Sequence, residues 1–313
     1  MPNSSGKYLL QYFVVTSFVI GIWSQGFAAE ERAKLREVAP GLYFNHDQLV
    51  SNSVVLITNE GVLVVDSRMH PDDADSLIED IQAITSKPIK WLINSQFHGD
   101  HMMGNSSFKD AGATIVAHRD TSRIMEQKFD HELEKRLQYF PRLGYSDRPV
   151  ELVMPDVLFD ERLTIKLGAK TVEVLFLGTG QNAGDTVVLF PESRMAFSSG
   201  TFGRQTWTNT EYTPSMDVWL ETMQKLRNLD VDAYLPPHGD IGTKADLDES
   251  AMLFAQMNEV VKSGIESDQS IDDIVRNNLF DEYSEWRNYK LREKNLRALY
   301  HLETTGVAPY FSE

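Results

Sequence analysis

The side chains best suited to metal chemistry lie in one short stretch, Gln96-Phe97-His98-Gly99-Asp100-His101. Two imidazoles and a carboxylate, from His98, Asp100 and His101, fall within four residues. The apolar run 89–93 just before them predicts a short buried strand. The metal-capable side chains would then lie on the loop at the C-terminal end of a strand, where α/β proteins usually place their chemistry. Imidazole plus carboxylate suits zinc, with iron and manganese as alternatives.

This stretch resembles the HxHxDH signature of the metallo-β-lactamase superfamily, with Gln96 in place of the first His. Residues 178–191, 195–201 and 233–240 resemble three further motifs of the same superfamily. The chain is thus identified as a divergent member with Gln at two metal-ligand positions. The resemblance covers residues 38–243 and implies an α/β (α+β) fold, the four-layer αββα metallo-β-lactamase sandwich.

The resemblance implies two metal positions, and one of them keeps all its ligands. Its residues are Asp100, His101 and His238. Two imidazoles and one carboxylate leave room for a water, whose pKa a bound metal lowers towards neutrality. We therefore expect one zinc ion per chain.

The other implied position has lost most of its ligands. Gln96 and Gln181 stand where the superfamily has His, and Thr201 replaces a bridging Asp. A neutral amide is a poor zinc ligand, but it can hydrogen-bond to a substrate oxygen or to the nucleophilic water. His98 would be free to act as general base or as a hydrogen-bond donor to substrate. The expected catalytic residues are His98, Asp100, Gln96 and Gln181, and the expected metal-binding residues are Asp100, His101, His238 and His98.

A further carboxylate, Asp66, closes the apolar run 61–66, which predicts a buried strand. In the superfamily an acidic residue stands at the corresponding place, before the first helix. Asp66 is therefore expected to orient a metal ligand or a loop, with a helix N-cap as the other interpretation.

Periodic hydrophobicity places these residues on alternating strands and helices. The helix over 216–229 is expected to pack on a sheet through Val218, Met223 and Leu226. Expected strands are 38–44, 53–58, 61–66, 89–93, 113–118, 157–159, 163–165 and 172–177, and expected helices are 72–85, 105–111 and a C-terminal helical extension from 246.

Composition limits the partners. The chain has 313 residues, 46 acidic against 30 basic, and a formal net charge of −16. This argues against nucleic acid or an anionic membrane surface as a partner and leaves a small-molecule substrate as the expectation, with the oligomeric state open. There is no cysteine, so disulfides and thiolate ligands are excluded.

The N-terminus has the pattern of a secretory signal peptide. Lys7 precedes an apolar run over 8–23, and small residues follow at Gly26, Ala28 and Ala29. We expect residues 1–29 to be cleaved and residues 30–313 to form a single domain in the periplasm or outside the cell. An uncleaved membrane anchor is the alternative, although the run is short for a full span.

Two classes of function remain open. One is a single-zinc hydrolase acting on an ester, lactone, thioester or amide carbonyl, β-lactams included. The other is a catalytically silent ligand-binding protein with a degenerate metal site. The aromatic residues Trp207, Tyr212, Tyr139 and Phe140 would either wall the site or pack in the core. His118 and His131 lie outside the motifs, and we expect them to be structural and on the surface, respectively.

Overall fold

The structure is a computed structural model, and it describes residues 35–47, 49–277 and 280–312. These described residues belong to one compact unit. The expected signal peptide, residues 1–29, lies outside the described residues. Among the residues described, none of the helices combines the length and apolar character that a membrane span requires.

The first sheet has seven strands in the order β1-β2-β3-β4-β5-β6-β7. The first four pair antiparallel, whereas β4 to β7 run parallel. Parallel strands need crossover connections, which the intervening helices provide. The strands are β1 (Leu35–Ala39), β2 (Leu42–Asn45), β3 (Ser53–Ile57), β4 (Val62–Val65), β5 (Ile89–Asn94), β6 (Thr114–His118) and β7 (Val157–Phe159).

The expectation of a single strand over 38–44 is wrong, because a turn at Pro40 and Gly41 divides it into β1 and β2. Gly41 has a φ of +75°, and a Cβ there would lie 2.6 Å from the carbonyl oxygen of Ile57. Only glycine adopts this conformation without strain at such a close approach.

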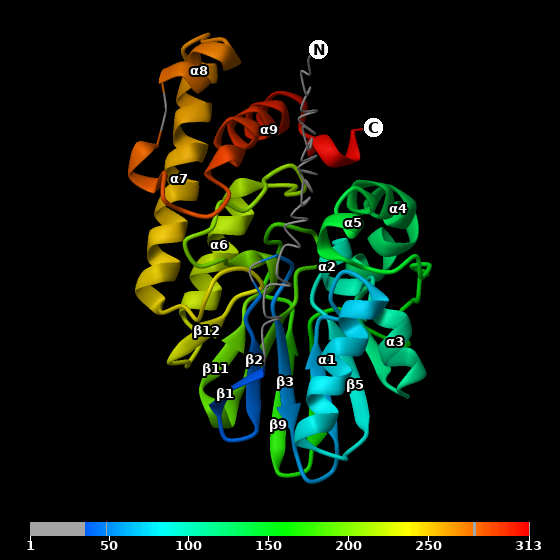
Figure 1. Cartoon of the computed structure of the whole chain (residues 1–313). Coiled ribbons are helices and arrows are strands. Elements are labelled where there is room, and N and C mark those ends of the chain that lie inside the picture. Colours follow the sequence, from blue (N-terminus) through cyan, green and yellow to red (C-terminus); the bar gives the residue numbers. More distant parts are fainter. Residues whose placement is uncertain (1–34, 48, 278–279, 313) are drawn as a thin grey trace, which may run out of the picture. The chain divides into compact units, whose positions relative to one another are not determined.

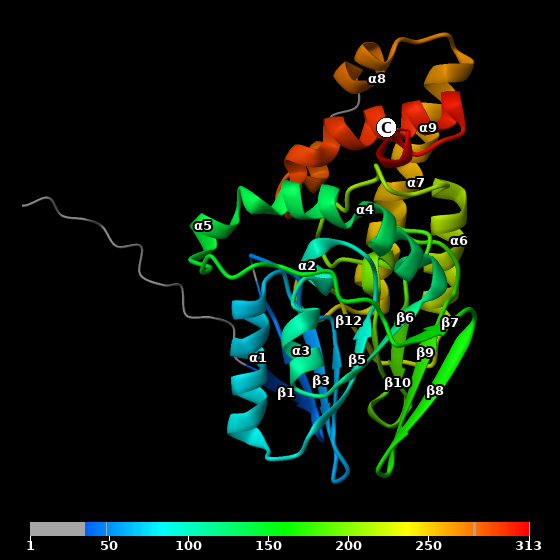
Figure 2. The same cartoon turned by 90° about the vertical axis from the view of Figure 1, so that its right-hand side faces the viewer.

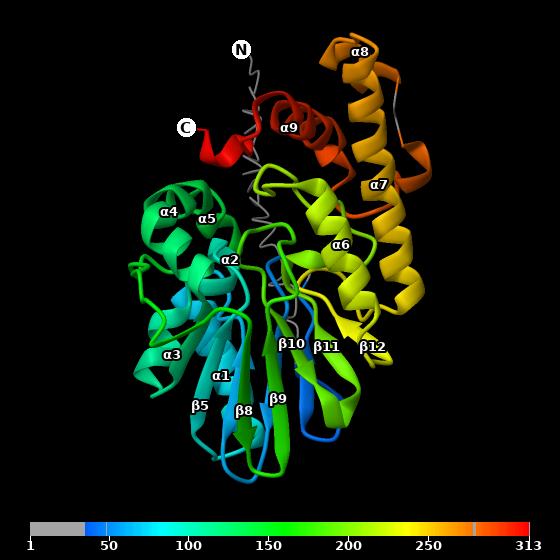
Figure 3. The same ribbon diagram turned by 180° about the vertical axis from the view of Figure 1, so that it is seen from behind.

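The second sheet has five strands in the order β12-β11-β10-β9-β8 (Figure 3). Its pairs are antiparallel except for β11 and β12, which are parallel. The strands are β8 (Arg162–Leu167), β9 (Lys170–Leu175), β10 (Val187–Phe190), β11 (Met195–Phe197) and β12 (Ala233–Leu235).

The two sheets pack face to face, with helices on both outer faces (Figure 2). In β3, Val54 and Leu56 point into the core between the sheets, while Val55 faces the helices outside. Strands buried on both faces are apolar along their whole length for this reason. The four-layer αββα arrangement is confirmed. Helices α1 (Pro71–Ile84) and α3 (Asn105–Asp110) cover the first sheet, and α6 (Met216–Arg227) and α7 (Lys244–Glu266) cover the second.

Helix α6 packs through a different face from the one expected. Val218 is 39% exposed, whereas Trp219 is fully buried and donates from Nε1 to the carbonyl of Thr201 at 3.0 Å. Met223 and Leu226 are buried as expected. The buried residues follow helical spacing, and Val218 falls outside that stripe.

The remaining helices lie mostly around the end of the sheets where the motif residues are found (Figure 1). The α-helices are α2 (Gly99–Met102), α4 (Arg119–Leu137), α5 (Phe140–Leu143), α8 (Ile271–Asn277) and α9 (Arg292–Thr305). Short 3-10 turns are η1 (Pro191–Ser193), η2 (Ser199–Thr201), η3 (Asp281–Tyr283), η4 (Tyr289–Leu291) and η5 (Pro309–Phe311).

Hydrogen bonds join the two sheets at this end. The carbonyl of Ser95, after β5, accepts from the backbone of Thr186 at 2.9 Å and from the hydroxyl of Ser199 at 3.0 Å. Asn52, before β3, donates its backbone N–H to the carbonyl of Pro237 at 2.7 Å. These bonds fix the loop after β5 to the segments before β10 and after β11, and the loop after β12 to the segment before β3.

Candidate metal centre

Three retained donors meet where these loops come together. Asp100 and His101 belong to α2, after β5, and His238 lies in the loop after β12. Asp100 Oδ2 is 3.7 Å from His101 Nε2 and 3.5 Å from His238 Nε2, and the donor atoms of all three lie within 4.8 Å of one another. Ligands of one tetrahedral zinc ion are about 3.4 Å apart for bonds near 2 Å. The donor set fits one such ion, and we call these three residues the intact position.

Asp66 orients His101 from behind. The carboxylate Oδ2 lies 2.6 Å from His101 Nδ1 and accepts from the hydroxyl of Ser95 at 2.8 Å, and Oδ1 accepts from the backbone N–H of Ser95 at 2.8 Å. Asp66 has a φ of 65°, a left-handed conformation that Asp tolerates better than most residues. A bond to Nδ1 leaves Nε2 facing the other two donors. The N-cap interpretation is wrong, because the side chain of His70 caps α1.

Arg136 of α4 fixes the carboxylate of Asp100. Its Nη2 donates to Oδ1 of Asp100 at 2.9 Å, which leaves Oδ2 towards the two imidazoles. Burial alone would raise the pKa of Asp100, but Arg136 and the neighbouring imidazoles lower it well below its ordinary value. The aspartate therefore stays ionised, as a metal ligand must. Sequence reasoning missed Arg136, which lies 36 residues along the chain from Asp100.

Arg136 is held in turn by Glu132, a fully buried carboxylate one helical turn earlier. Glu132 Oε2 lies 3.3 Å from Arg136 Nη2 and accepts from the backbone of Gly99 at 3.2 Å. Its Oε1 accepts from Lys135 at 3.2 Å and from the hydroxyl of Tyr310 at 3.1 Å. Burial opposes ionisation, but the surrounding groups lower the pKa of Glu132 to about 2. The only sequence signal was the spacing of Glu132 and Arg136, which is typical of a helical ion pair.

Gln96 contacts the intact position directly. Its Nε2 lies 2.9 Å from His101 Nε2, and Asn182 donates to its Oε1 at 2.6 Å. Asn182 also donates to Asp185 at 2.9 Å, so the amide of Gln96 is oriented with its N–H towards the imidazole. A metal at His101 must displace this hydrogen bond. A metal must also compete with a proton for His101. Burial lowers the pKa of this imidazole, but the carboxylates of Asp66 and Asp100 outweigh burial and raise it.

The other metal position does not assemble. Gln181 Nε2 donates to the carbonyl of Asn209 at 3.1 Å. Within the described part of the chain, Thr201 Oγ1 and His98 Nε2 are buried and have no hydrogen-bond partner. His98 packs against Tyr212, with ring centroids 4.2 Å apart, and burial lowers its pKa to about 3. Such an imidazole is neutral at pH 7 and is a weak proton acceptor. We call Gln96, His98, Gln181 and Thr201 the altered position.

Of the other residues singled out in the sequence, most pack rather than wall the site. Trp207 is fully buried in the core beneath the second sheet, and Phe140 is buried against the ring of His70, whereas Tyr139 is 42% exposed. Only Tyr212 touches a motif residue, His98. His118 caps α4, and His131 is exposed.

Comparisons with known proteins show what the chain is similar to. The chain is 26% identical over 152 residues to a type 2 metallo-beta-lactamase of Elizabethkingia meningoseptica, covering 49% of this chain and 52% of that protein. It is 24% identical over 212 residues to a linear primary-alkylsulfatase of Pseudomonas sp. (strain ATCC 19151), covering 58% and 40%.

Among solved structures, the chain is similar to the stereoselective inverting sec-alkylsulfatase Pisa1 of Pseudomonas sp., with a TM-score of 0.68 and 15% sequence identity. The match covers 90% of this chain and 52% of that chain. The chain thus spans about half the length of these relatives. Residues 46–238 match the family model of the metallo-beta-lactamase superfamily. The chain therefore belongs to the metallo-β-lactamase superfamily.

Proposed function

We propose that this protein is a metal-dependent hydrolase that binds a single zinc ion at the intact position. Its substrate would be a small molecule with an ester, lactone, thioester or amide carbonyl, β-lactams included. The observation that carries the proposal is the convergence of Asp100, His101 and His238 at ligand spacing, from segments far apart in the sequence. Iron and manganese are the alternative ions for this donor set.

A bound divalent ion would supply a water of lowered pKa and would polarise the carbonyl. The chain itself does the positioning: Arg136 keeps Asp100 ionised with Oδ2 free, and Asp66 holds His101 with Nε2 towards the site. The Nε2 of His98 is buried and has no partner among the described residues, so it is free for a hydrogen bond to a substrate or a water. We propose hydrogen bonding to the substrate as the role of His98, because its lowered pKa makes it a poor base.

A second candidate function rests on the contact between Gln96 and His101. An amide that already occupies the Nε2 of a metal ligand favours a pocket used without metal. The protein would then bind a ligand without turning it over. Metal content separates the two functions.

The first test is elemental analysis of the purified protein after dialysis against zinc. We expect a single ion per chain in the wild type and none in Asp100→Ala or His238→Ala. His131→Ala is the matched control, because that imidazole is exposed and its ring contacts Tyr310 rather than a proposed ligand. Folded protein that takes up no metal would support the ligand-binding function and contradict ours.

The second test is a substrate screen with esters, lactones, thioesters and β-lactams, and with an alkyl sulfate because of the relatives found. We expect the wild type to turn over at least one carbonyl substrate and Asp100→Ala to turn over none. Adding zinc to metal-free protein should restore turnover only where Asp100, His101 and His238 are all present. Metal-loaded protein without turnover of any carbonyl substrate would contradict a carbonyl hydrolase.

We also propose that the protein is exported, with cleavage after Ala28 or Ala29. The charged start, apolar run and small residues of the N-terminus support this. Intact mass measurement of protein from the periplasm or the medium should show loss of the first 28 or 29 residues. Full-length protein in the membrane fraction would indicate the anchor instead.

A further inference from the structure

Arg287 is a cation without an anionic partner among the described residues. No hydrogen bond or ion pair of its side chain is found there, although its backbone is firmly fixed. Its N–H donates to the carbonyl of Gln205 and its carbonyl accepts from Trp207, both at 2.9 Å. Gln205 has a φ of 46°, a left-handed conformation. A backbone held in a strained loop beside a site often serves the site's function.

Arg287 lies beside the loop that carries His238. It lines a pocket of about 460 Å³ together with Gly239, which directly follows His238. Burial lowers the pKa of Arg287, and its side chain is half-buried. Arg287 is therefore a partly desolvated charge at a pocket next to the loop of one proposed metal ligand.

Most other charges of this pocket already have partners. Arg204 donates to Asp246 at 3.0 Å, and Asp240 accepts from Arg36 at 2.9 Å. Glu285 is exposed and forms no ion pair with Arg287 among the described residues. The pocket thus retains one guanidinium, that of Arg287, without an ion pair among the described residues. The carboxylate of Glu285 also lines the pocket, but it is exposed to solvent.

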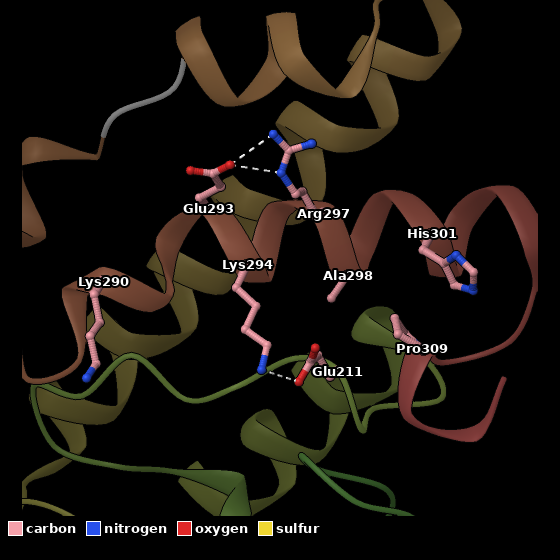
Figure 4. Close-up of a pocket in the computed structure, with 8 residues that line it drawn as sticks. All are labelled: Glu211, Lys290, Glu293, Lys294, Arg297, Ala298, His301 and Pro309. Carbon is pink, nitrogen blue, oxygen red and sulfur yellow. Dashed lines mark hydrogen bonds and ion pairs between the residues drawn. The ribbon is translucent and has the colours of Figure 1, made fainter. Parts of the chain in front are cut away.

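A second pocket, of about 490 Å³, shows the contrast (Figure 4). It is lined by residues of α9, and its charges are largely neutralised within the chain. Lys294 pairs with Glu211 at 2.6 Å, and Arg297 pairs with Glu293 at 2.9 Å (Figure 4). None of the motif residues lines it, and we assign no ligand to it.

We propose that Arg287 binds an oxyanion of the substrate, a carboxylate or sulfate group, in the pocket beside His238. A guanidinium presents paired N–H donors that match two oxygens of such a group. The chain as a whole carries a charge of −16, so an anion needs a local cation to bind near the site. The proposal rests on the proposed function and narrows its substrates to those that carry a negative charge apart from the bond cleaved.

The first test measures binding without turnover. Glutarate and its neutral diamide are titrated into the purified protein by calorimetry at constant ionic strength. We expect glutarate to bind and the diamide not to. Arg287→Gln should weaken glutarate binding about tenfold or more, and Arg287→Lys less. Glu285→Gln should strengthen it, and Arg162→Gln, an exposed arginine of β8, should leave it unchanged.

The second test uses the 4-nitrophenyl esters of glutaric acid, which is anionic, and of pentanoic acid, which is neutral. We expect kcat/KM to favour the anionic ester and Arg287→Gln to reduce that preference about tenfold or more. Turnover of both esters with an unchanged preference in Arg287→Gln would overturn the role of Arg287 and leave the hydrolase standing.

The two proposals fail in different ways. Binding of glutarate that depends on Arg287, without turnover of either ester, would support the anion site and count against the hydrolase. Glutarate binding that is absent, or equal in wild type and Arg287→Gln, would overturn the anion site whatever the activity.

Discussion

The intact and altered positions share one set of loops, but two of the three donors of the intact position are supported from behind. The third, His238, has a buried Nδ1 without a hydrogen-bond partner among the described residues. Asp66 fixes the ring of His101 through Nδ1, and Arg136 occupies one oxygen of Asp100. Each contact leaves the remaining donor atom towards the centre. Supporting contacts of this kind keep metal ligands oriented, and their loss typically weakens metal binding about 10- to 100-fold.

At the altered position the polar groups are used elsewhere or have no partner. Gln96 is directed at His101, and Gln181 donates to the backbone of Asn209. Within the described residues, Thr201 Oγ1 accepts and donates nothing. The difference between the positions therefore extends beyond ligand identity. Asp66 and Arg136 direct two donors towards the centre of the intact position, whereas Asn182 directs the amide of Gln96 at His101. This asymmetry supports a single metal.

The largest expected effect is on the support of the intact position. Arg136→Met should lower the free energy of unfolding by about 3 kcal/mol, because it removes a partner of two buried carboxylates, Asp100 and Glu132. Urea unfolding of metal-free protein measures this. Arg119→Met, on the same helix, removes an exposed ion pair with Asp160 and should cost less than about 1 kcal/mol. Equal costs for both variants would contradict the support we assign to Arg136.

Asp66→Asn should weaken zinc binding about 10- to 100-fold, because it loosens the ring of His101 without removing a ligand. Asn tolerates the left-handed backbone of this position, so the fold should persist. Competition with a chelator measures the affinity. Asp160→Asn is the control, an exposed carboxylate that pairs with Arg119 rather than with a proposed ligand. If Asp66→Asn bound zinc within twofold of the wild type, orientation by Asp66 would not matter.

A further effect, smaller when counted per pH unit, concerns the pH dependence of stability. The pKa of His98 is lowered from 6.5 to about 3 in the folded state. Between these values the unfolded chain binds a proton that the folded chain does not, so this contribution is present above pH 6.5 and lost as the pH falls. Metal-free wild type should lose about 1.4 kcal/mol per pH unit below pH 6 from this group. His98→Gln should be less steep by that amount, and parallel curves would contradict a buried neutral His98.

The smallest effect is expected at Gln181. Gln181→Ala removes a hydrogen bond to a backbone carbonyl and no metal donor. Zinc content and affinity, measured by elemental analysis and chelator competition, should stay within about twofold of the wild type, well below the effect expected of a supporting residue. A marked loss of metal would show that the altered position takes part in binding.

The sequence was sufficient for the fold and for the retained donors. Asp100 and His101 follow a strand within one motif, and His238 follows another, so the carboxyl ends of strands bring them together. The supporting residue Asp66 was likewise indicated by its place at a strand end. These residues share a feature, since each lies just beyond a strand whose position the hydrophobic pattern predicts.

Residues that act from helices or from the C-terminal region could not be predicted. Arg136 lies within a polar, 19-residue helix, and the sequence does not tell which of its charged side chains faces Asp100. Arg287 lies outside the helices and the two sheets. Its backbone is fixed by hydrogen bonds to Gln205 and Trp207, which are far from it in the sequence. The prediction that Val218 is buried was wrong for a similar reason. The hydrophobic pattern of α6 did not tell that Trp219, rather than its neighbour Val218, faces the core.

The most direct test is anomalous diffraction at the zinc edge from crystals grown with excess zinc. Our account predicts a single strong peak bonded to Asp100, His101 and His238, with Gln96 moved away from His101 Nε2. A peak at His98, a second peak of equal strength, or no peak between those three side chains would contradict it.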